Sequence, residues 1–212
     1  MKKKILEFGG VAAGIILVAF GIAAIVLGFQ GKSTVTSSLK EQQIVGTPDM
    51  TPSAIRDEAK QAGLPASIKL PTCTVANLAV NSGSRARCFA DYMRIHAYEA
   101  TGGVTYAKMP RYATQDGKGT NDPTKALQQN GRPVDNVARN VWVTETALST
   151  ALNVSYMADQ LGNFGIVVGI ALLLSGFGFV ILAVGGALRA GSWLFERKSS
   201  ETTARVTTSV TA

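Results

Sequence analysis

Residues 163–188 read NFGIVVGIALLLSGFGFVILAVGGAL, an uncharged run dominated by Leu, Ile, Val, Phe and Gly. A helix rises about 1.5 Å per residue, so a run of this length slightly exceeds the roughly 30 Å of bilayer hydrocarbon and can cross it with some tilt. We therefore predict a transmembrane helix at residues 163–189. No proline follows Pro133, so this span can be the lower half of one helix that begins near Asp135.

A second uncharged run, at residues 8–31, follows the positive cluster Lys2–Lys4. A charged start before an apolar middle is also typical of a signal peptide. This run is longer than a usual signal core, and no small-x-small cleavage pair stands out between it and the polar stretch after Lys32. We therefore interpret residues 8–31 as an uncleaved first membrane span.

Small residues recur at helical spacing along both predicted spans. Alternate steps of three and four residues give one apolar or small stripe in the second half of the chain: Val134, Val137, Val141, Thr144, Leu148, Ala151, Ser155, Ala158, Gly162, Gly165, Gly169, Leu172 and Gly176. The first span has a similar line: Gly10, Gly14, Leu17, Gly21, Ala24, Gly28 and Gly31. Small residues let helix backbones approach closely in lipid, so the glycines of the two lines predict the contact of an antiparallel helix pair. Packing on a copy or on another subunit would use the same surface, and glycine is also common in membrane spans generally.

Two spans place both termini on one side of the membrane. Lys2–Lys4 flank the first span, and Arg189, Arg197 and Lys198 follow the second, so the positive-inside rule assigns that side to the cytoplasm. The predicted organisation is a cytoplasmic N-terminus at 1–7, spans at 8–31 and 163–189, an extracytoplasmic domain at 32–162 and a cytoplasmic Ser/Thr-rich tail at 190–212. The expected location is the cell membrane, as a multi-pass protein.

Cys73 and Cys88 are the only cysteines, and both lie in the segment expected to face outward. Oxidising compartments favour the pairing of such cysteines, so we predict a Cys73–Cys88 disulfide, with two unpaired structural thiols as the alternative. A structural zinc site of the usual kind has four ligands, whereas the chain offers two cysteines and one histidine. No metal ion or other cofactor is therefore expected.

The outward segment is expected to be small and mostly helical. Thr51-Pro52 is typical of a helix start and Gly63 of its end, and a second helix is expected at residues 85–100. Residues 111–133 are rich in Gly, Asp, Asn, Gln and Pro and predict a mobile loop. The expected fold class is thus mainly α: a two-span transmembrane helical hairpin with a small, mostly helical, disulfide-tied extracytoplasmic domain.

Several ordered segments carry a resemblance to a known family: Gly46-Thr-Pro-Asp-Met-Thr-Pro52, Ala86-Arg-Cys-Phe-Ala90, Tyr92-Met-Arg-Ile-His96, Glu99-Ala-Thr-Gly-Gly103, Thr105-Tyr106 and Ala138-Arg-Asn-Val-Trp-Val-Thr-Glu-Thr-Ala-Leu148. The chain resembles a family of uncharacterised actinobacterial two-span membrane proteins, whose members are sometimes labelled aromatic ring-opening dioxygenases. The resemblance implies an actinobacterial envelope protein. The dioxygenase label does not fit, because a non-haem iron site of that kind needs two His and a carboxylate, and His96 is the only histidine.

Tyr92, His96 and Glu99 share one face of the predicted 85–100 helix. A His beside a carboxylate can respond to pH, although a His that is hydrogen-bonded within the domain is the more ordinary interpretation. No nucleophile motif is present, so no catalytic or cofactor-binding residues are predicted and the protein is not expected to be an enzyme. An envelope enzyme that uses Glu99, Glu145 or Asp91 as an acid or base is the least favoured hypothesis.

Neither uncharged run, 8–31 or 163–188, contains an ionisable residue, which argues against proton relays and ion pathways. We expect a non-enzymatic structural or interaction component of the cell envelope, which docks through its outward domain and its glycine-lined helices. Its expected partners are the lipid bilayer and another membrane or envelope protein, or a second copy of the chain, with weak contact to anionic envelope polymers and none to nucleic acid. The alternative is a membrane sensor or regulator whose tail at 190–212 is modified.

Overall fold

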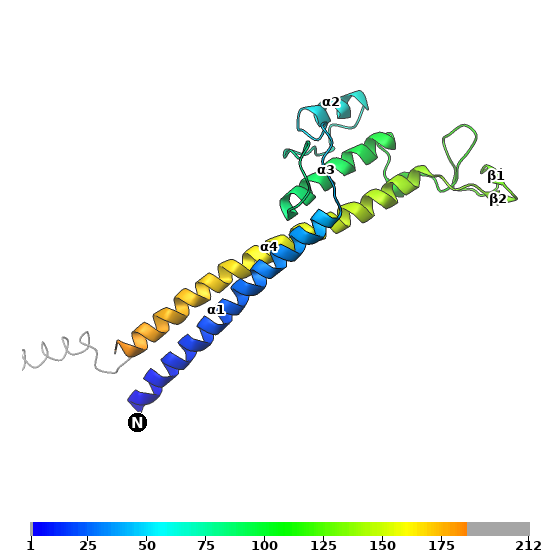
Figure 1. Cartoon of the computed structure of the whole chain (residues 1–212). Coiled ribbons are helices and arrows are strands. Elements are labelled where there is room, and N and C mark those ends of the chain that lie inside the picture. Colours follow the sequence, from blue (N-terminus) through cyan, green and yellow to red (C-terminus); the bar gives the residue numbers. More distant parts are fainter. Residues whose placement is uncertain (1, 186–212) are drawn as a thin grey trace, which may run out of the picture. The chain divides into compact units, whose positions relative to one another are not determined.

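The computed structural model describes residues 2–185, with side chains from Glu7 onward. Its elements are α1 (Lys2–Glu41), α2 (Ala54–Gln61), α3 (Gly83–Ala100), a 3-10 turn (Tyr106–Lys108), β1 (Gln128–Gln129), β2 (Arg132–Pro133) and α4 (Ala138–Val184) (Figure 1). The prediction of a mainly α fold is confirmed. The chain divides into two compact units, one made of the residues up to Gln30 and from Gly162 onward, the other of Gly31–Leu161.

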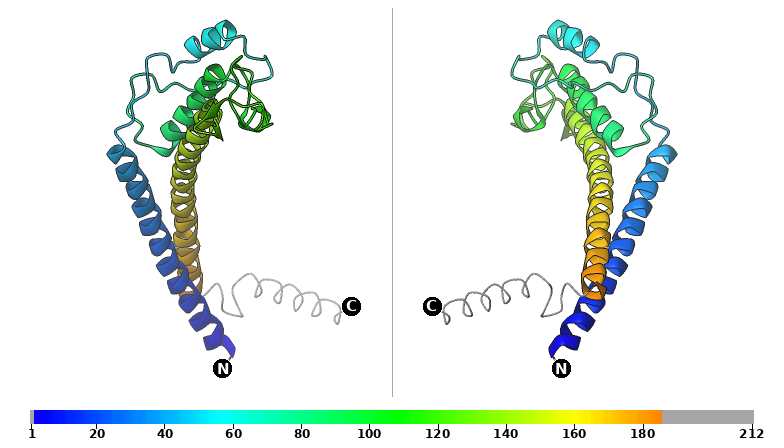
Figure 2. Two further views of the ribbon diagram at one scale, coloured as in Figure 1. Left: turned by 90° about the vertical axis from the view of Figure 1, so that its right-hand side faces the viewer. Right: turned by 90° about the vertical axis from the view of Figure 1, so that its left-hand side faces the viewer.

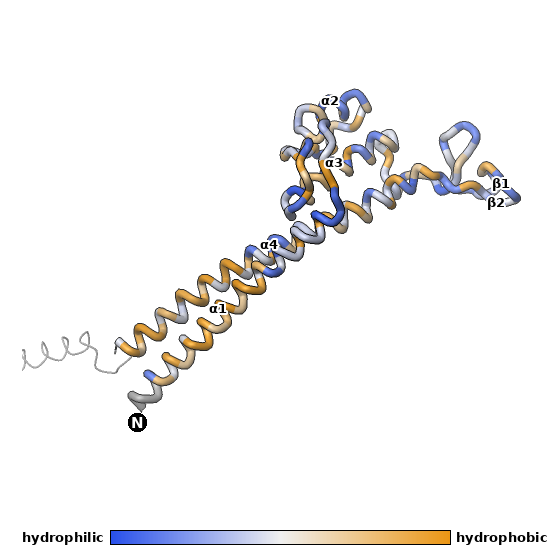
Figure 3. Tube along the Cα trace, viewed as in Figure 1, coloured by the Kyte–Doolittle hydropathy of each residue, from blue (hydrophilic) through white to orange (hydrophobic). Residues whose placement is uncertain are grey.

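Two of the described helices, α1 and α4, are long and apolar enough to cross a membrane. Each contains an 18-residue window of mean hydropathy 2.7, of which only 17% is buried. Figure 3 shows this continuous apolar character along both helices of the first unit. Low burial distinguishes these helices from the core helix of a soluble protein, whose apolar side chains face a protein interior. Both helices also continue beyond their apolar runs, α1 to Glu41 and α4 back to Ala138.

Within the first unit, α1 and α4 run antiparallel and meet at glycines. Three pairs lie opposite one another: Gly14 with Gly176, Gly21 with Gly169, and Gly28 with Gly162. A Cβ atom added to Gly14, Gly21 or Gly28 would lie 2.7–2.8 Å from the carbonyl oxygen of the glycine opposite. No ordinary side chain fits in that space, so the contact depends on the absence of Cβ atoms. The spacing of seven residues along each helix keeps the three pairs on one side of it.

The other two glycines of the predicted contact are less crowded. A Cβ atom on Gly165 would lie 3.4 Å from the Ala24 carbonyl oxygen, which is an ordinary packing distance, and Gly10 is half-buried. Gly31, part of the same line on α1, has no neighbour within 4 Å of an added Cβ. The helix contact therefore uses every second member of the glycine line rather than all of it.

The stripe predicted along the first half of α4 coincides with its contact surface only in part: Val141 and Leu148 pack against buried clusters, whereas other members do not. Val137 is 73% exposed and Thr144 is also exposed, whereas Trp142, Glu145 and Leu152 are buried. The reason is a change of neighbour: in the second unit α4 packs against α3 and the segment that follows it. The Trp142 indole lies edge-on to Tyr98, with 4.9 Å between ring centroids. A stripe that continues from one end of a helix to the other presumes one partner along its whole length.

The core of the second unit forms around α3. Its buried side chains are Leu39 from α1, Ile55 from α2, Leu152 from α4, Met50, Val75 and Val80 from the connecting segments, and Phe89, Tyr92 and Ile95 from α3 itself. α3 begins at an N-cap, because the Ser82 hydroxyl accepts a hydrogen bond from the Arg85 N–H at 3.4 Å. The short α2 contacts α3 directly (Figure 2).

Residues 111–133, predicted to be a mobile loop, contain backbone pairing. The strands β1 and β2 pair antiparallel, with Gln129 opposite Arg132. The turn between them is Asn130-Gly131, whose two residues have φ values of 53° and 73°. Positive φ at both positions is the conformation that Asn-Gly adopts in a tight hairpin. The Asn-Gly pair is therefore a local indication of a hairpin within the segment that was expected to be mobile. Tyr112 also forms bridges with Thr120 and Asp135.

The glycine contact leads to a first prediction. Gly21→Leu places a side chain where an added Cβ already lies 2.8 Å from the Gly169 carbonyl oxygen, so the two helices must move apart, by roughly 2 Å if the contact persists. Gly178→Leu is the matched control, because nothing lies within 4 Å of a Cβ there. Spin labels at cysteines replacing the exposed Ile22 and Ile170 would report the change by pulsed electron resonance. Equal distance distributions in both variants would contradict the close contact.

Candidate functional site

A disulfide joins Cys73 to Cys88, with 6.1 Å between their Cα atoms, and confirms the predicted pairing. It connects the extended segment before Val75 to the second turn of α3. Tyr92 lies one turn further along α3, is fully buried, and donates a hydrogen bond from its hydroxyl to the Cys73 carbonyl oxygen at 2.6 Å. Burial, together with the nearby Asp49 charge, raises the pKa of Tyr92, so its hydroxyl stays protonated as a donor. Two interactions, the disulfide and the Tyr92 hydrogen bond, thus attach this segment to α3.

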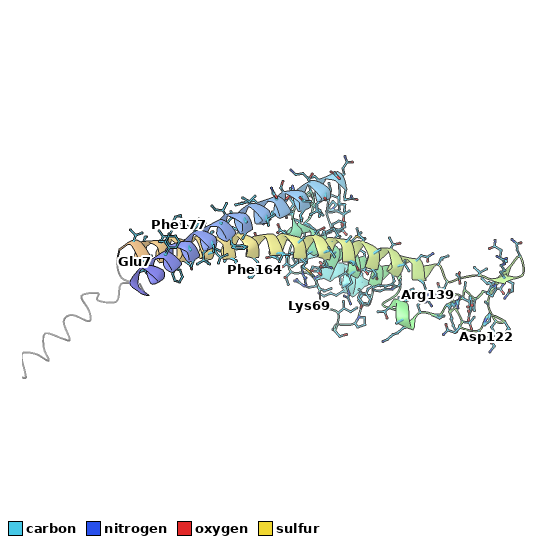
Figure 4. The ribbon with its side chains drawn as sticks, turned by 90° about the horizontal axis from the view of Figure 1, so that it is seen from below. Glu7, Lys69, Asp122, Arg139, Phe164 and Phe177 are labelled. Atoms are coloured by element: carbon cyan, nitrogen blue, oxygen red, sulfur yellow. A yellow bond between two sulfur atoms is a disulfide. The ribbon has the colours of Figure 1, made fainter. Side chains whose placement is uncertain are left out.

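A cleft of about 670 Å³ opens between this segment and α3. Its lining includes three cationic side chains, Lys69, Arg87 and Arg94, and one carboxylate, Asp91. Lys69 is labelled in Figure 4. The remaining lining is partly apolar and includes Ile68, Leu70, Pro71 and Ile95. The cleft therefore combines an excess of positive charge with hydrophobic surface.

The two arginines of the cleft are oriented by aromatic rings rather than by carboxylates. The guanidinium carbon of Arg87 lies 5.2 Å from the Tyr156 ring centroid, and that of Arg94 lies 5.9 Å from the Tyr98 ring centroid. Neither arginine takes part in any of the salt bridges found among residues 7–185. A guanidinium held by a ring keeps its hydrogen-bond donors available, so both arginines can bind an anionic group in the cleft.

A second cluster surrounds His96, on another part of α3. The Nε2 atom of His96 lies 3.1 Å from Oδ2 of Asp49 and 3.8 Å from Oε2 of Glu58. Asp49 precedes α2 and Glu58 belongs to it, so both carboxylates reach His96 from far earlier in the sequence. Burial, the largest influence, raises the pKa of Asp49, but hydrogen bonds from Thr47 and from its own backbone and the charge of His96 together lower it below its usual value.

Glu99 completes this cluster from the next turn of α3. Burial raises the pKa of Glu99, and the negative charges of Glu58 and Asp49 raise it further, against the opposing effect of His96. Its Oε1 atom is buried without a hydrogen-bond partner. The predicted shared face of Tyr92, His96 and Glu99 therefore included only residues of α3 itself. The carboxylates closest to His96 are Asp49 and Glu58, which sequence reasoning missed because no local pattern links them to it.

The three carboxylates of the least favoured enzyme hypothesis lie in different surroundings. Glu99 belongs to the His96 cluster, and Asp91 lines the basic cleft. Glu145 is buried in α4 and accepts a hydrogen bond from the Ser149 hydroxyl at 2.7 Å. The predicted cytoplasmic tail at 190–212 lies outside the described residues, as does Arg189.

No family model, no curated protein and no solved structure matches this chain.

The disulfide provides a second prediction. It closes a loop of 15 residues, so replacing both cysteines by serine should lower the free energy of unfolding by about 3 kcal/mol through the greater entropy of the unfolded chain. Urea unfolding of the full chain in detergent, followed by Trp142 fluorescence in a Trp193→Phe background, measures the change. Reduction of the parent chain should give the same shift, and an unchanged unfolding midpoint would contradict the prediction.

Proposed function

We propose that this chain is a non-enzymatic integral protein of the cell membrane, in which α1 and α4 form a two-span hairpin and residues 32–162 form an extracytoplasmic docking domain. The observation that carries the proposal is the distribution of side chains in the first unit. Glycines occupy the closest approach of the two helices, while many large apolar side chains point away from it and are more than half exposed, among them Phe20, Leu27, Phe164 and Leu174.

This distribution suits lipid better than water. In water, helices bury their large apolar side chains against each other, because removing that surface from water is worth about 25 cal/mol per Å². In a bilayer the lipid already covers such side chains, and close packing of small residues becomes the main source of helix association. The uncharged runs of both helices also lack the ionisable groups that transport pathways use, which favours an anchoring role.

The basic cleft supports a docking role for the domain. Lys69, Arg87 and Arg94 attract anionic groups, and the neighbouring half-buried Ile68 and Leu70 offer hydrophobic contact. A uniformly charged polymer would use only the first of these two features. An acidic peptide segment with apolar side chains would use both, so we infer that the partner is another envelope protein that presents such a segment.

A third prediction tests the topology. A cysteine that replaces Gln115 should react with a membrane-impermeant maleimide on intact cells, because this exposed residue belongs to the proposed outward domain. A cysteine that replaces Ser200 should react only after permeabilisation. Alkaline carbonate should leave both variants in the membrane fraction. Labelling of position 115 only after permeabilisation would overturn the proposed orientation, and extraction by carbonate would overturn membrane integration.

A fourth prediction tests the cleft. The double variant Arg87→Glu/Arg94→Glu should weaken binding of a fluorescent peptide of alternating Glu and Leu by at least about tenfold, since two attractive charges become repulsive. Arg56→Glu is the matched control, because Arg56 is exposed on α2 and does not line the cleft. Fluorescence anisotropy in mild detergent, at low and high salt, measures both variants.

Two results would count against the docking role of the cleft. Equal affinity in the double variant and the Arg56→Glu control would place peptide binding elsewhere. Stronger binding of a polyphosphate than of the peptide would favour a polymer partner instead.

A further inference from the structure

We propose that Asp49, Glu58, His96 and Glu99 bind one zinc ion. The cluster brings together two parts of the second unit: the segment that leads into and forms α2, and the C-terminal half of α3. The usual sequence signature of zinc sites is a set of closely spaced cysteines and histidines, and both cysteines of this chain are used in the disulfide. The proposed site instead combines one imidazole with carboxylates.

The distances fit a small ion. In a tetrahedral zinc site with bonds of 2.0–2.2 Å, ligand atoms are separated by roughly 3.3–3.6 Å. The Nε2 atom of His96 lies 3.1 Å from Asp49 Oδ2 and 3.8 Å from Glu58 Oε2, on either side of that range. One ligand atom from each of these three residues lies within 4.8 Å of the others.

Two unpartnered atoms provide independent support. His96 Nε2 and Glu99 Oε1 are both buried, and neither has a hydrogen-bond partner among the described residues. The 3.1 Å contact of His96 Nε2 with Asp49 satisfies the distance for an ion pair but not the alignment of a hydrogen bond. In the neutral tautomer that carries its proton on Nδ1, the Nε2 lone pair faces carboxylate oxygens, and a metal ion between them would replace this repulsion by attraction.

The excess of negative charge in the cluster also favours binding of a cation. Three carboxylates face one imidazole, and among the described side chains Asp49 and Glu58 form salt bridges only with His96, while Glu99 forms none. No Lys or Arg balances them. A divalent ion would neutralise the excess and would lower the electrostatic repulsion that raises the pKa of Glu99.

The ligand set indicates the class of metal. Calcium and magnesium prefer oxygen ligands alone, whereas imidazole favours zinc and neighbouring transition metals. Asp49, Glu58 and His96 form the compact ligand group. We assign the fourth position to Glu99, whose buried Oε1 atom has no hydrogen-bond partner, and four protein ligands are typical of a structural site. Bound zinc would join α2 to α3, a connection that the disulfide does not make. This inference does not depend on the proposed membrane role.

The test uses the full chain in mild detergent, purified with a tag that contains no histidine and treated with a chelator. Isothermal titration with zinc should show one saturable site, and bound cobalt should show the absorption bands of tetrahedral coordination. Glu58→Gln and His96→Gln should each weaken zinc binding by at least tenfold. Asp57→Asn is the matched control, because Asp57 is the exposed neighbour of Glu58 on the same helix and lies outside the cluster; its affinity should be unchanged.

A second measurement, the thermal midpoint, remains informative for variants that fold poorly. Zinc should raise the thermal midpoint of the parent chain and of Asp57→Asn but not that of Glu58→Gln. Because His96 is the only histidine, X-ray absorption of the zinc complex should show a single imidazole. Absence of saturable binding, equal binding in all variants, or a preference for calcium or magnesium over zinc would each overturn the proposal.

Discussion

The first unit depends on the absence of side chains where two helices meet. At Gly14, Gly21 and Gly28 the backbone of α1 lies so close to α4 that an added Cβ atom would reach a carbonyl oxygen. At this separation the helices gain van der Waals contact along their backbones, and many of their large side chains are left on the outer surface. That surface is what a bilayer would cover, so one steric constraint explains both the helix pairing and the exposed apolar side chains.

The second unit is stabilised in a different way, because it is small and has few large buried side chains. α3 supplies more of its core than any other element, and the other segments are attached to α3 by specific interactions as well as by hydrophobic burial. The disulfide and the Tyr92 hydroxyl hold the segment around Cys73. Trp142 holds α4 to the segment after α3, since its indole N–H donates to the Val104 carbonyl oxygen at 2.8 Å. Small domains commonly need such additional connections, because their buried apolar area alone supplies little stability.

Both polar sites are arranged around the same helix. Arg87 and Arg94 are seven residues apart on α3 and both line the cleft, while His96 and Glu99 belong to the carboxylate cluster. α3 can present two groups of opposite charge because α4 and its own aromatic residues orient the arginines, and the α2 segment brings the carboxylates to His96. The rigid position of α3 in the core is thus what gives each site a defined geometry.

The sequence by itself determined the features that depend on local pattern. Long uncharged runs identified α1 and α4, because hydropathy and length are properties of consecutive residues. The presence of α2 and α3 and the end of α3 at Ala100 were predicted in the same way, although α3 begins at Gly83, two residues before the predicted start. The disulfide followed from the presence of only two cysteines. The tertiary structure alone decided which face of α4 is buried near Trp142, and that Asp49 and Glu58 meet His96. These contacts join residues about forty positions apart, and their formation depends on how the segments pack, for which no spacing in the sequence gives a signal.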